Sequence, residues 1–240
     1  MVVCTIEARM TSSRLPGKVL LPAAGKPLLE LMVERVRRSR HVDAVVIATT
    51  TNADDDPIVE LAERLGIGVH RGSEEDVLGR VLGAAQGAGA ELIVELTGDC
   101  PLMDPAIVDH IVDEFRRGDA DYAANVLQPT YPRGMDVQVF PAAVLAEVAT
   151  LTDDPADREH VSLYIYEHPE RYRLRSVVAD EPADHRLTVD TPADYELVKS
   201  IFEELYPADP AFGLGAILAL LERRPELLEL NAHVEQKRAR

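Results

Sequence analysis

The stretch from residue 2 to residue 21 reads VVCTIEARMTSSRLPGKVLL and contains the two features from which a fold can be inferred. Residues 2–6 form a short apolar run with the length and composition of a buried strand. Residues 8–21 then place three cations among small residues: Arg9, Arg14 and Lys18 with Thr11, Ser12, Ser13 and Gly17. In open α/β sheets, ligands bind beside loops that leave the carboxyl ends of strands, so this loop is a candidate binding site.

The chemistry of this loop matches what a triphosphate requires. Guanidinium groups bind paired oxygens, an ammonium supplies a point charge, and glycine lets backbone N–H groups approach an anion closely. Because no acid lies between Ala8 and Pro27, we expect the partner of Lys18 to be a ligand. A solvated basic loop is the alternative, and spacing alone does not separate the two interpretations.

The charge of the chain restricts its partners. Its 240 residues carry 25 Lys and Arg against 42 Asp and Glu, a formal net charge of −17, which repels nucleic acid and anionic membranes. We therefore expect neither as a partner, and an anionic substrate must be met by a local basic cluster or by a metal. Two cysteines without zinc-type spacing, and the lack of a secretory signal or of an apolar run of about 18 residues, predict a cytoplasmic protein.

The first half of the chain alternates apolar runs with helical patterns, and its 46% hydrophobic residues suffice for a sizeable core. We expect strands over 2–6, 44–49, 69–70 and 91–96, with helices beginning near 27, near 57 and at 76. This order predicts an α/β fold with a mostly parallel central sheet and helices on both faces.

The second half has a different pattern. We expect helices over 104–117, 142–150, 157–167, 192–205 and 212–223, and strands over 120–126, 137–140, 172–178 and 186–189. We interpret residues 1–240 as a single domain in which residues from about 128 to 170 form a small lobe. The stretches 161–166 and 212–221 carry more apolar side chains than such a lobe can bury, which predicts a homodimer.

Two aspartates follow strands and are expected at the same edge of the sheet as the basic loop. Asp99 lies in LTGDCPLMDP and Asp190 lies in RLTVDTPADYE. Two carboxylates from separate strands, completed by water and phosphate oxygens, are how Mg²⁺ is usually held. Helix capping is the alternative, and for Asp190 alone it fits equally well because a proline follows two residues later. We interpret Asp104, before Pro105, as a cap only.

Three further polar segments are candidates. Arg71, Ser73 and Asp76 enter a helix and either flank a nucleotide or form a capping box with Ser73 as the N-cap. Two islands in the second half are candidates for holding an acidic acceptor: Tyr131, Arg133 and Asp136, and Arg158 with His160. For these islands surface charge is the more common explanation, and a half-buried histidine is the simpler interpretation of His160.

These segments resemble one known family. ARMTSSRLPGKVL is similar to the signature loop of the sugar-acid cytidylyltransferases, which include the KDO and acylneuraminate synthetases. RGSEEDVLGR, LTGDCPLMDP, DREHV and RLTVDTPADYELV resemble more closely the spore-coat polysaccharide biosynthesis protein F type. The blocks run in order from residue 3 to about 198. Pro192 stands where the acylneuraminate branch has a second acid, so a two-acid cluster there is not expected.

The resemblance implies a Rossmann-like, GT-A-type nucleotidyltransferase fold, CTP as a substrate and Mg²⁺ as the cofactor. It implies catalytic or metal-binding roles for Arg14, Lys18, Asp99 and Asp190. It implies nucleotide contacts from a larger set, namely Ala8, Arg9, Ser12, Ser13, Arg14, Gly17, Lys18, Arg71, Ser73, Asp76 and Gly98. We therefore expect transfer of CMP from CTP to an acidic sugar, sugar phosphate or phosphonate, with release of pyrophosphate. A glycosyltransferase that uses a nucleotide sugar, or a non-catalytic nucleotide-binding module, are the alternatives.

Overall fold

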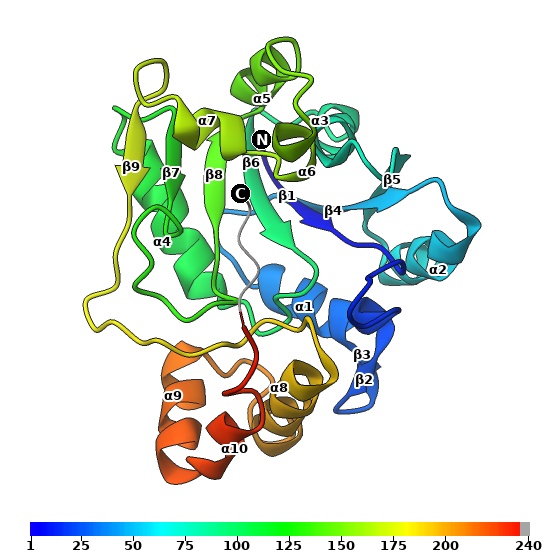
Figure 1. The fold of residues 1–240 in the computed structure, drawn as a ribbon, viewed down its shortest axis with the longest axis vertical. Helices are drawn as coiled ribbons and strands as arrows, with labels where there is room; N and C mark the ends of the chain where they lie inside the picture. The colour runs from blue at the N-terminus through cyan, green and yellow to red at the C-terminus, as the bar shows by residue number, and fades with distance from the viewer. Residues whose placement is uncertain (236–240) are drawn as a thin grey trace.

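A seven-stranded sheet forms the centre of the computed structural model, which describes residues 1–235 (Figure 1). Its strand order is β5-β4-β1-β6-β8-β7-β9. Four strands from the first half are parallel, namely β1 (Val2–Glu7), β4 (Ala44–Thr50), β5 (Gly68–Gly72) and β6 (Leu92–Thr97). The residues of β1, β4 and β6 are largely buried, as expected for parallel strands covered on both faces, whereas those of the edge strand β5 are half-buried or exposed. The mostly parallel sheet predicted from the sequence is confirmed.

The three remaining strands extend the sheet beyond β6. Strand β8 (Gln138–Pro141) is antiparallel to β6 and to β7 (Tyr122–Ala124), and β9 (Leu174–Ser176) is parallel to β7. Strands β7 and β9 are shorter than the expected 120–126 and 172–178, whereas β8 has the expected length and is shifted by one residue. A two-stranded hairpin, β2 (Pro22–Ala23) with β3 (Lys26–Pro27), follows the basic loop.

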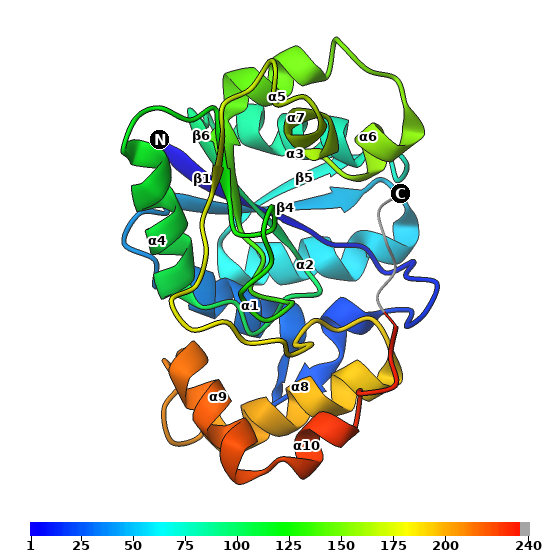
Figure 2. The ribbon, with the colours of Figure 1, turned by 60° about the vertical axis from the view of Figure 1, so that its left-hand side comes forward.

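Helices cover both faces of the sheet (Figure 2). On one face lie α1 (Leu28–Val36), α2 (Asp56–Leu65) and α4 (Pro105–Arg116), and their core continues into the C-terminal helices α8 (Pro192–Leu205), α9 (Leu214–Arg223) and α10 (Glu226–Glu229). On the other face lie α3 (Val77–Gly87), α5 (Ala142–Val148), α6 (Pro155–Glu159) and α7 (Leu163–Glu167). Short 3-10 turns occupy Lys18–Leu20 and Ala53–Asp55.

Two expected elements are wrong. Residues 186–189 form only an isolated bridge, because their backbone groups bond to the loops at Arg133 and Asp99 instead of to a neighbouring strand. The helix expected over 157–167 is broken into α6 and α7 at Val161, whose φ is +20°. The break lets the Ser162 hydroxyl reach the side chain of Gln138 in the sheet.

The apolar side chains that motivated a homodimer are largely buried inside the single chain. Val161, Leu163 and Ile165 are buried, and so are Phe212 and Ile217. That surplus of apolar surface is therefore absent from the described residues, and the argument from it is wrong. Within residues 1–235, no helix has both the length and the hydropathy that a membrane crossing requires.

Candidate active site at the carboxyl edge of the sheet

The basic loop begins where β1 ends and closes upon itself. The Ala8 N–H donates to Ala48 O at 3.2 Å, and the Gly17 N–H donates to Met10 O at 2.8 Å. Gly17 has a φ of +71°, a conformation that suits glycine. Val19 is buried directly after the turn and anchors the loop in the core. Lys18, which directly precedes Val19, is therefore held at the rim of the sheet.

Gly98 brings the ends of β1 and β6 together. Its N–H donates to Glu7 O at 2.8 Å, and a Cβ atom at this position would lie only 2.7 Å from the same oxygen. A side chain would therefore force the two strand ends apart. The close approach places Asp99, the next residue, beside the loop that leaves β1.

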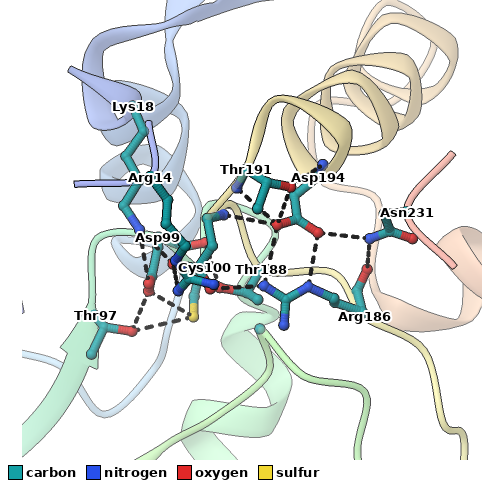
Figure 3. A network of polar contacts seen from close by, with 12 residues as sticks. Arg14, Lys18, Thr97, Asp99, Cys100, Arg186, Thr188, Thr191, Asp194 and Asn231 are labelled. Atoms are coloured by element: carbon teal, nitrogen blue, oxygen red, sulfur yellow. Dashed lines mark hydrogen bonds and ion pairs between the residues drawn. The ribbon is translucent and has the colours of Figure 1, made fainter. Parts of the chain in front are cut away.

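The Lys18 ammonium lies between the two aspartates (Figure 3). Its Nζ atom is 3.1 Å from Oδ2 of Asp99 and 2.9 Å from Oδ1 of Asp190. Lys18 therefore has partners within the chain, because acids distant in sequence reach it, and the lack of an acid near it in sequence is not by itself evidence for a ligand. Burial opposes the charge of Lys18, but the two carboxylates outweigh burial and raise its pKa. Arg14 Nη2 joins the same cluster, 3.0 Å from Oδ1 of Asp190.

Asp99 and Asp190 are connected through backbone as well as through Lys18. The Val189 N–H donates to Asp99 O at 2.8 Å, and the Asp99 carboxylate accepts from the Thr97 hydroxyl at 2.6 Å. Burial acts to raise the pKa of Asp99, but Lys18 and Thr97 outweigh it and hold that pKa below its usual value. The two strand-end loops are thus held as one unit.

Neither aspartate caps a helix. Helix α8 is capped by Thr191, whose hydroxyl accepts from the Asp194 N–H in a capping box, and α4 is capped by Asp104. The capping alternative for Asp99 and Asp190 is therefore wrong, while the structural interpretation of Asp104 is confirmed. The two carboxylates are left to face the cluster of cations.

The arrangement fits a hard divalent cation. Asp99 and Asp190 already share the positive charge of Lys18 between their facing oxygens, and Arg14 lies beside the same oxygen of Asp190. Within residues 1–235, no three His, Cys, Asp or Glu side chains gather closely enough to hold a metal by themselves. A magnesium ion bound here would take two carboxylates from the protein and its other oxygens from water and phosphate, which is its usual preference.

The polar loop of residues 73–76 lies against the basic loop. Glu74 accepts from Asn52 at 2.6 Å, pairs with Arg9 at 3.1 Å and also accepts from the Thr11 hydroxyl. These contacts place residues 73–76 beside the basic loop. Within the basic loop Ser13 and Arg14 are exposed, and Ser12 is half-buried.

The other residues expected around the nucleotide have structural partners. Arg71 fastens the segment after β4, with Nη1 2.7 Å from Asp56 Oδ1 and Nη2 2.7 Å from Asn52 O. The N-cap of α3 is Asp76, which accepts from the Gly79 N–H at 2.9 Å, so the alternative of a capping box with Ser73 as N-cap is wrong. Ser73 instead accepts from the Asp76 N–H at 3.2 Å.

The two acceptor islands lie on separate elements. Arg133 is exposed on the connection between β7 and β8, and it lines a cavity of about 420 Å³ together with His185, Arg186 and Asn231. Asp136, three residues later, has its pKa raised by burial and by the charge of Asp99. Tyr131 is half-buried.

Arg158 belongs to α6 and is held against the start of α3. Its guanidinium lies 3.4 Å from Oδ1 of Asp76 and donates to Ala149 O at 3.1 Å. His160 is half-buried at the end of α6, where its N–H donates to Ala156 O. Arg158 therefore has a structural role in addition to any contact with a substrate.

Sequence reasoning missed three residues that surround Asp190. Arg186 Nη2 lies 2.8 Å from Oδ2 of Asp190, Asp194 binds that arginine, and Asn231 binds both Asp194 and Arg186. The Thr-x-x-Asp spacing of a capping box could have identified Asp194 as a fixed residue. Nothing in the sequence links Asn231 to a site 41 residues earlier in the chain.

Comparisons with known proteins agree with this geometry. A family model described as Cytidylyltransferase matches residues 3–238. The spore coat polysaccharide biosynthesis protein SpsF of Bacillus subtilis is 35% identical, with 94% of this chain and 95% of that protein covered. The structure of a cytidylyltransferase from Leptospira borgpetersenii superimposes with a TM-score of 0.90 at 35% identity, covering 95% of this chain and 96% of the other.

A more distant structure shares the fold. CMP:2-keto-3-deoxy-manno-octonic acid synthetase, solved in complex with CTP, superimposes with a TM-score of 0.67 at 21% identity, covering 85% of this chain and 99% of that one. The family model spans nearly the whole chain and includes the basic loop, Asp99 and Asp190. On these grounds the chain belongs to the cytidylyltransferase family.

Proposed function

We propose that this cytidylyltransferase transfers CMP from CTP to an acidic sugar, a sugar phosphate or a phosphonate, and releases pyrophosphate. The observation that carries the proposal is the convergence of Lys18, Asp99 and Asp190 at the edge of the sheet. This cluster combines two carboxylates with fixed cations at the place where open α/β sheets bind ligands. The acidic acceptor is proposed from the family resemblance and from the basic residues near the cluster.

Positioning and charge neutralisation account for most of the catalysis in such a transfer. An oxygen of the acceptor bonds to the α-phosphorus of CTP as the bond from that phosphorus to the pyrophosphate oxygen breaks. Lys18 and Arg14 bind the departing pyrophosphate and neutralise part of its negative charge. Asp99 and Asp190 would hold Mg²⁺, which neutralises phosphoryl oxygens and orients them when bound.

The remaining loop residues are proposed to surround the nucleotide. Gly17 and Ala8 let the backbone approach the phosphates, and Ser12 and Ser13 offer hydroxyl donors. Arg9 is tied to Glu74, so the loop that carries Ser73 and Asp76 borders the same space. Arg71 is proposed to act by holding this border in place.

Arg133 is the best-placed acceptor ligand. Its side chain is exposed and lines a cavity that also touches Arg186, the direct partner of Asp190. We propose that residues from about 128 to 170 bind the acceptor, with contributions from Tyr131, Asp136, Arg158 and His160. A homodimer and a cytoplasmic location are proposed on the family resemblance; light scattering at micromolar concentration tests the first.

A pyrophosphate-release screen tests the function. CTP, UTP, ATP and GTP are each incubated with Mg²⁺ and a panel of acidic sugars, sugar phosphates and phosphonates. We expect release that requires both CTP and one class of acceptor. In a parallel incubation with nucleotide sugars, release of the free nucleotide would instead favour the glycosyltransferase alternative, and nucleotide binding without any release would favour the non-catalytic module.

A further inference from the structure

The two carboxylate oxygens of Asp190 have different partners. Oδ1 faces the shared cation position, where Lys18 lies at 2.9 Å and Arg14 at 3.0 Å. Oδ2 points the other way and lies 2.8 Å from Nη2 of Arg186. Tilting this carboxylate out of its plane would break the second contact, so Arg186 fixes the orientation in which one oxygen faces the site.

Arg186 is itself held by Asp194. Nε of the arginine lies 2.8 Å from Oδ1 of Asp194, and Nη2 lies 3.1 Å from Oδ2. This paired contact fixes the plane of the guanidinium, as bidentate arginine–carboxylate pairs do. Asp194 is fully buried, and although burial acts to raise its pKa, Arg186 and Asn231 hold that pKa below its usual value.

Asp194 also fixes the backbone that carries Asp190. Its Oδ2 atom accepts from the Asp190 N–H at 3.1 Å and from the Thr191 N–H at 2.9 Å. The Asp194 carboxylate therefore restrains Asp190 in two ways: it holds the main chain directly and the side chain through Arg186. Figure 3 shows Asp194 and Arg186 on the side of the cluster away from Lys18.

Asn231 completes the arrangement from the C-terminal segment. Its Nδ2 atom donates to Asp194 Oδ1 at 2.9 Å and to Arg186 O at 3.0 Å. Asn231 is only 5% exposed, although it lies in a segment that is otherwise largely exposed. An amide that bridges the two residues behind Asp190 ties the end of the chain to the active site.

We propose that Arg186, Asp194 and Asn231 are positioning residues that hold Asp190 with Oδ1 directed at the metal. The inference rests on the proposed role of Asp190 as a metal ligand. Residues that orient a metal ligand typically change metal affinity by tenfold to a hundredfold when they are mutated. A network that only stabilised the fold would change the melting temperature and leave metal affinity as it is.

The test measures Mn²⁺ binding by calorimetry in the presence of CTP without acceptor, and the Mg²⁺ dependence of turnover. Asn231→Ala removes two donors and no charge, and Arg186→Lys keeps the charge but cannot reach Asp190 and Asp194 together. We expect both variants to bind Mn²⁺ roughly tenfold more weakly. Combining Asn231→Ala with Asp190→Asn should add no further loss of affinity, because the asparagine acts through that aspartate.

Asp109→Asn is the matched control. Asp109 is also a buried helical aspartate that accepts from an arginine, Arg40 Nε at 2.9 Å, and from Ser39. The Asp109→Asn variant should have a lower melting temperature than the parent and an unchanged affinity for Mn²⁺. Parental Mn²⁺ affinity in both test variants would overturn the inference and leave the proposed function intact. Weakened Mn²⁺ binding in a protein that releases no pyrophosphate with any acceptor would support the inference and count against the proposed function.

Discussion

The ammonium of Lys18 lies 2.9 Å from Oδ1 of Asp190, although 172 positions separate the two residues in the chain. The same ammonium lies 3.1 Å from Asp99, so Lys18 is a cation shared by two carboxylates that would otherwise repel each other, while Arg14 and Arg186 also pair with Asp190. A divalent metal bound by these acids would take over that neutralisation. Lys18 would then be released toward the triphosphate, which gives it one role without substrate and another with it.

Replacing Lys18 by methionine is therefore expected to lower stability and to make it depend on metal. The variant leaves the buried carboxylate of Asp190 and the half-buried one of Asp99 without their shared donor, a loss of roughly 1–3 kcal/mol. Thermal unfolding in EDTA should show a lower melting temperature than for the parent, and Mg²⁺ should restore much of the difference. CTP binding measured by calorimetry should weaken as well.

Lys199→Met is the control for the loss of a lysine. Lys199 lies on α8, where its Nζ atom is 3.9 Å from Glu203, and it should change neither the melting temperature nor its response to Mg²⁺. If Lys18→Met unfolds at the parental temperature in EDTA and gains nothing from Mg²⁺, the shared-cation interpretation is wrong.

Changing either metal-binding acid to asparagine should abolish most of the turnover. Asp99→Asn or Asp190→Asn removes a hard anionic ligand while keeping the shape of the side chain, so we expect turnover to fall by roughly a hundredfold or more. Circular dichroism should show intact secondary structure. Asp104→Asn is the comparison, because Asp104 caps α4 and accepts from Leu214 N. Asparagine can still cap the helix but loses one of the two accepting oxygens, so the change should cost roughly 1 kcal/mol of stability and leave turnover per folded molecule unchanged.

Local signals in the sequence predicted the fold well. Helix α8 was expected over 192–205 and spans Pro192–Leu205, because a Thr-Pro start and its acids mark the first turn. The parallel strands followed from apolar runs separated by helical patterns. The predicted bounds of the short second-half strands were less accurate. Strands β7 and β9 pair over only three residues, which leaves little sequence pattern to detect.

The partners within the site could not be predicted in the same way. The cations and acids were identified from their types and from their places after strands. Which acid meets Lys18, however, depends on contacts across 81 and 172 positions that only the folded sheet creates. Asn231 shows the same limit more strongly, since a lone asparagine near the end of the chain carries no local signal of the residues that it binds.

Removing Arg133 should weaken binding of the acceptor and leave that of CTP unchanged. Its guanidinium is exposed beside the cavity near Asp190, so Arg133→Ala removes a charge-assisted contact worth roughly 1.5–3 kcal/mol. Steady-state kinetics should show a higher acceptor KM with the CTP KM near its parental value. Arg223→Ala, an exposed arginine on α9, is the control. Equal acceptor KM values in the two variants would show that Arg133 is a surface charge that does not bind the acceptor.

Two neighbouring glutamates under the site are expected to make stability depend on pH. Glu95 is buried and Glu7 is half-buried on the adjacent strand. Desolvation raises the pKa of Glu7 to about 7, against the opposing effects of the Glu95 side chain and of Arg80, and burial raises the pKa of Glu95 as well. In the unfolded chain a glutamate has a pKa of about 4.3. Between these values the native state holds more protons than the unfolded state, so stability falls as the pH rises.

Glu7→Gln removes one of these titrating groups while keeping its size. We expect the melting temperature of the parent to fall from pH 5 to pH 8, and that of the variant to fall less, so that the variant gains most at pH 8. Glu34→Gln is the control with the opposite sign, because Lys26 and Tyr206 outweigh partial burial and lower the pKa of Glu34. The contribution of Glu34 to stability is present above its unfolded pKa, so its loss should lower the melting temperature similarly at pH 5 and pH 8. A Glu7→Gln variant whose melting temperature follows the parent across this range would show that the glutamate pair does not hold an extra proton in the folded protein.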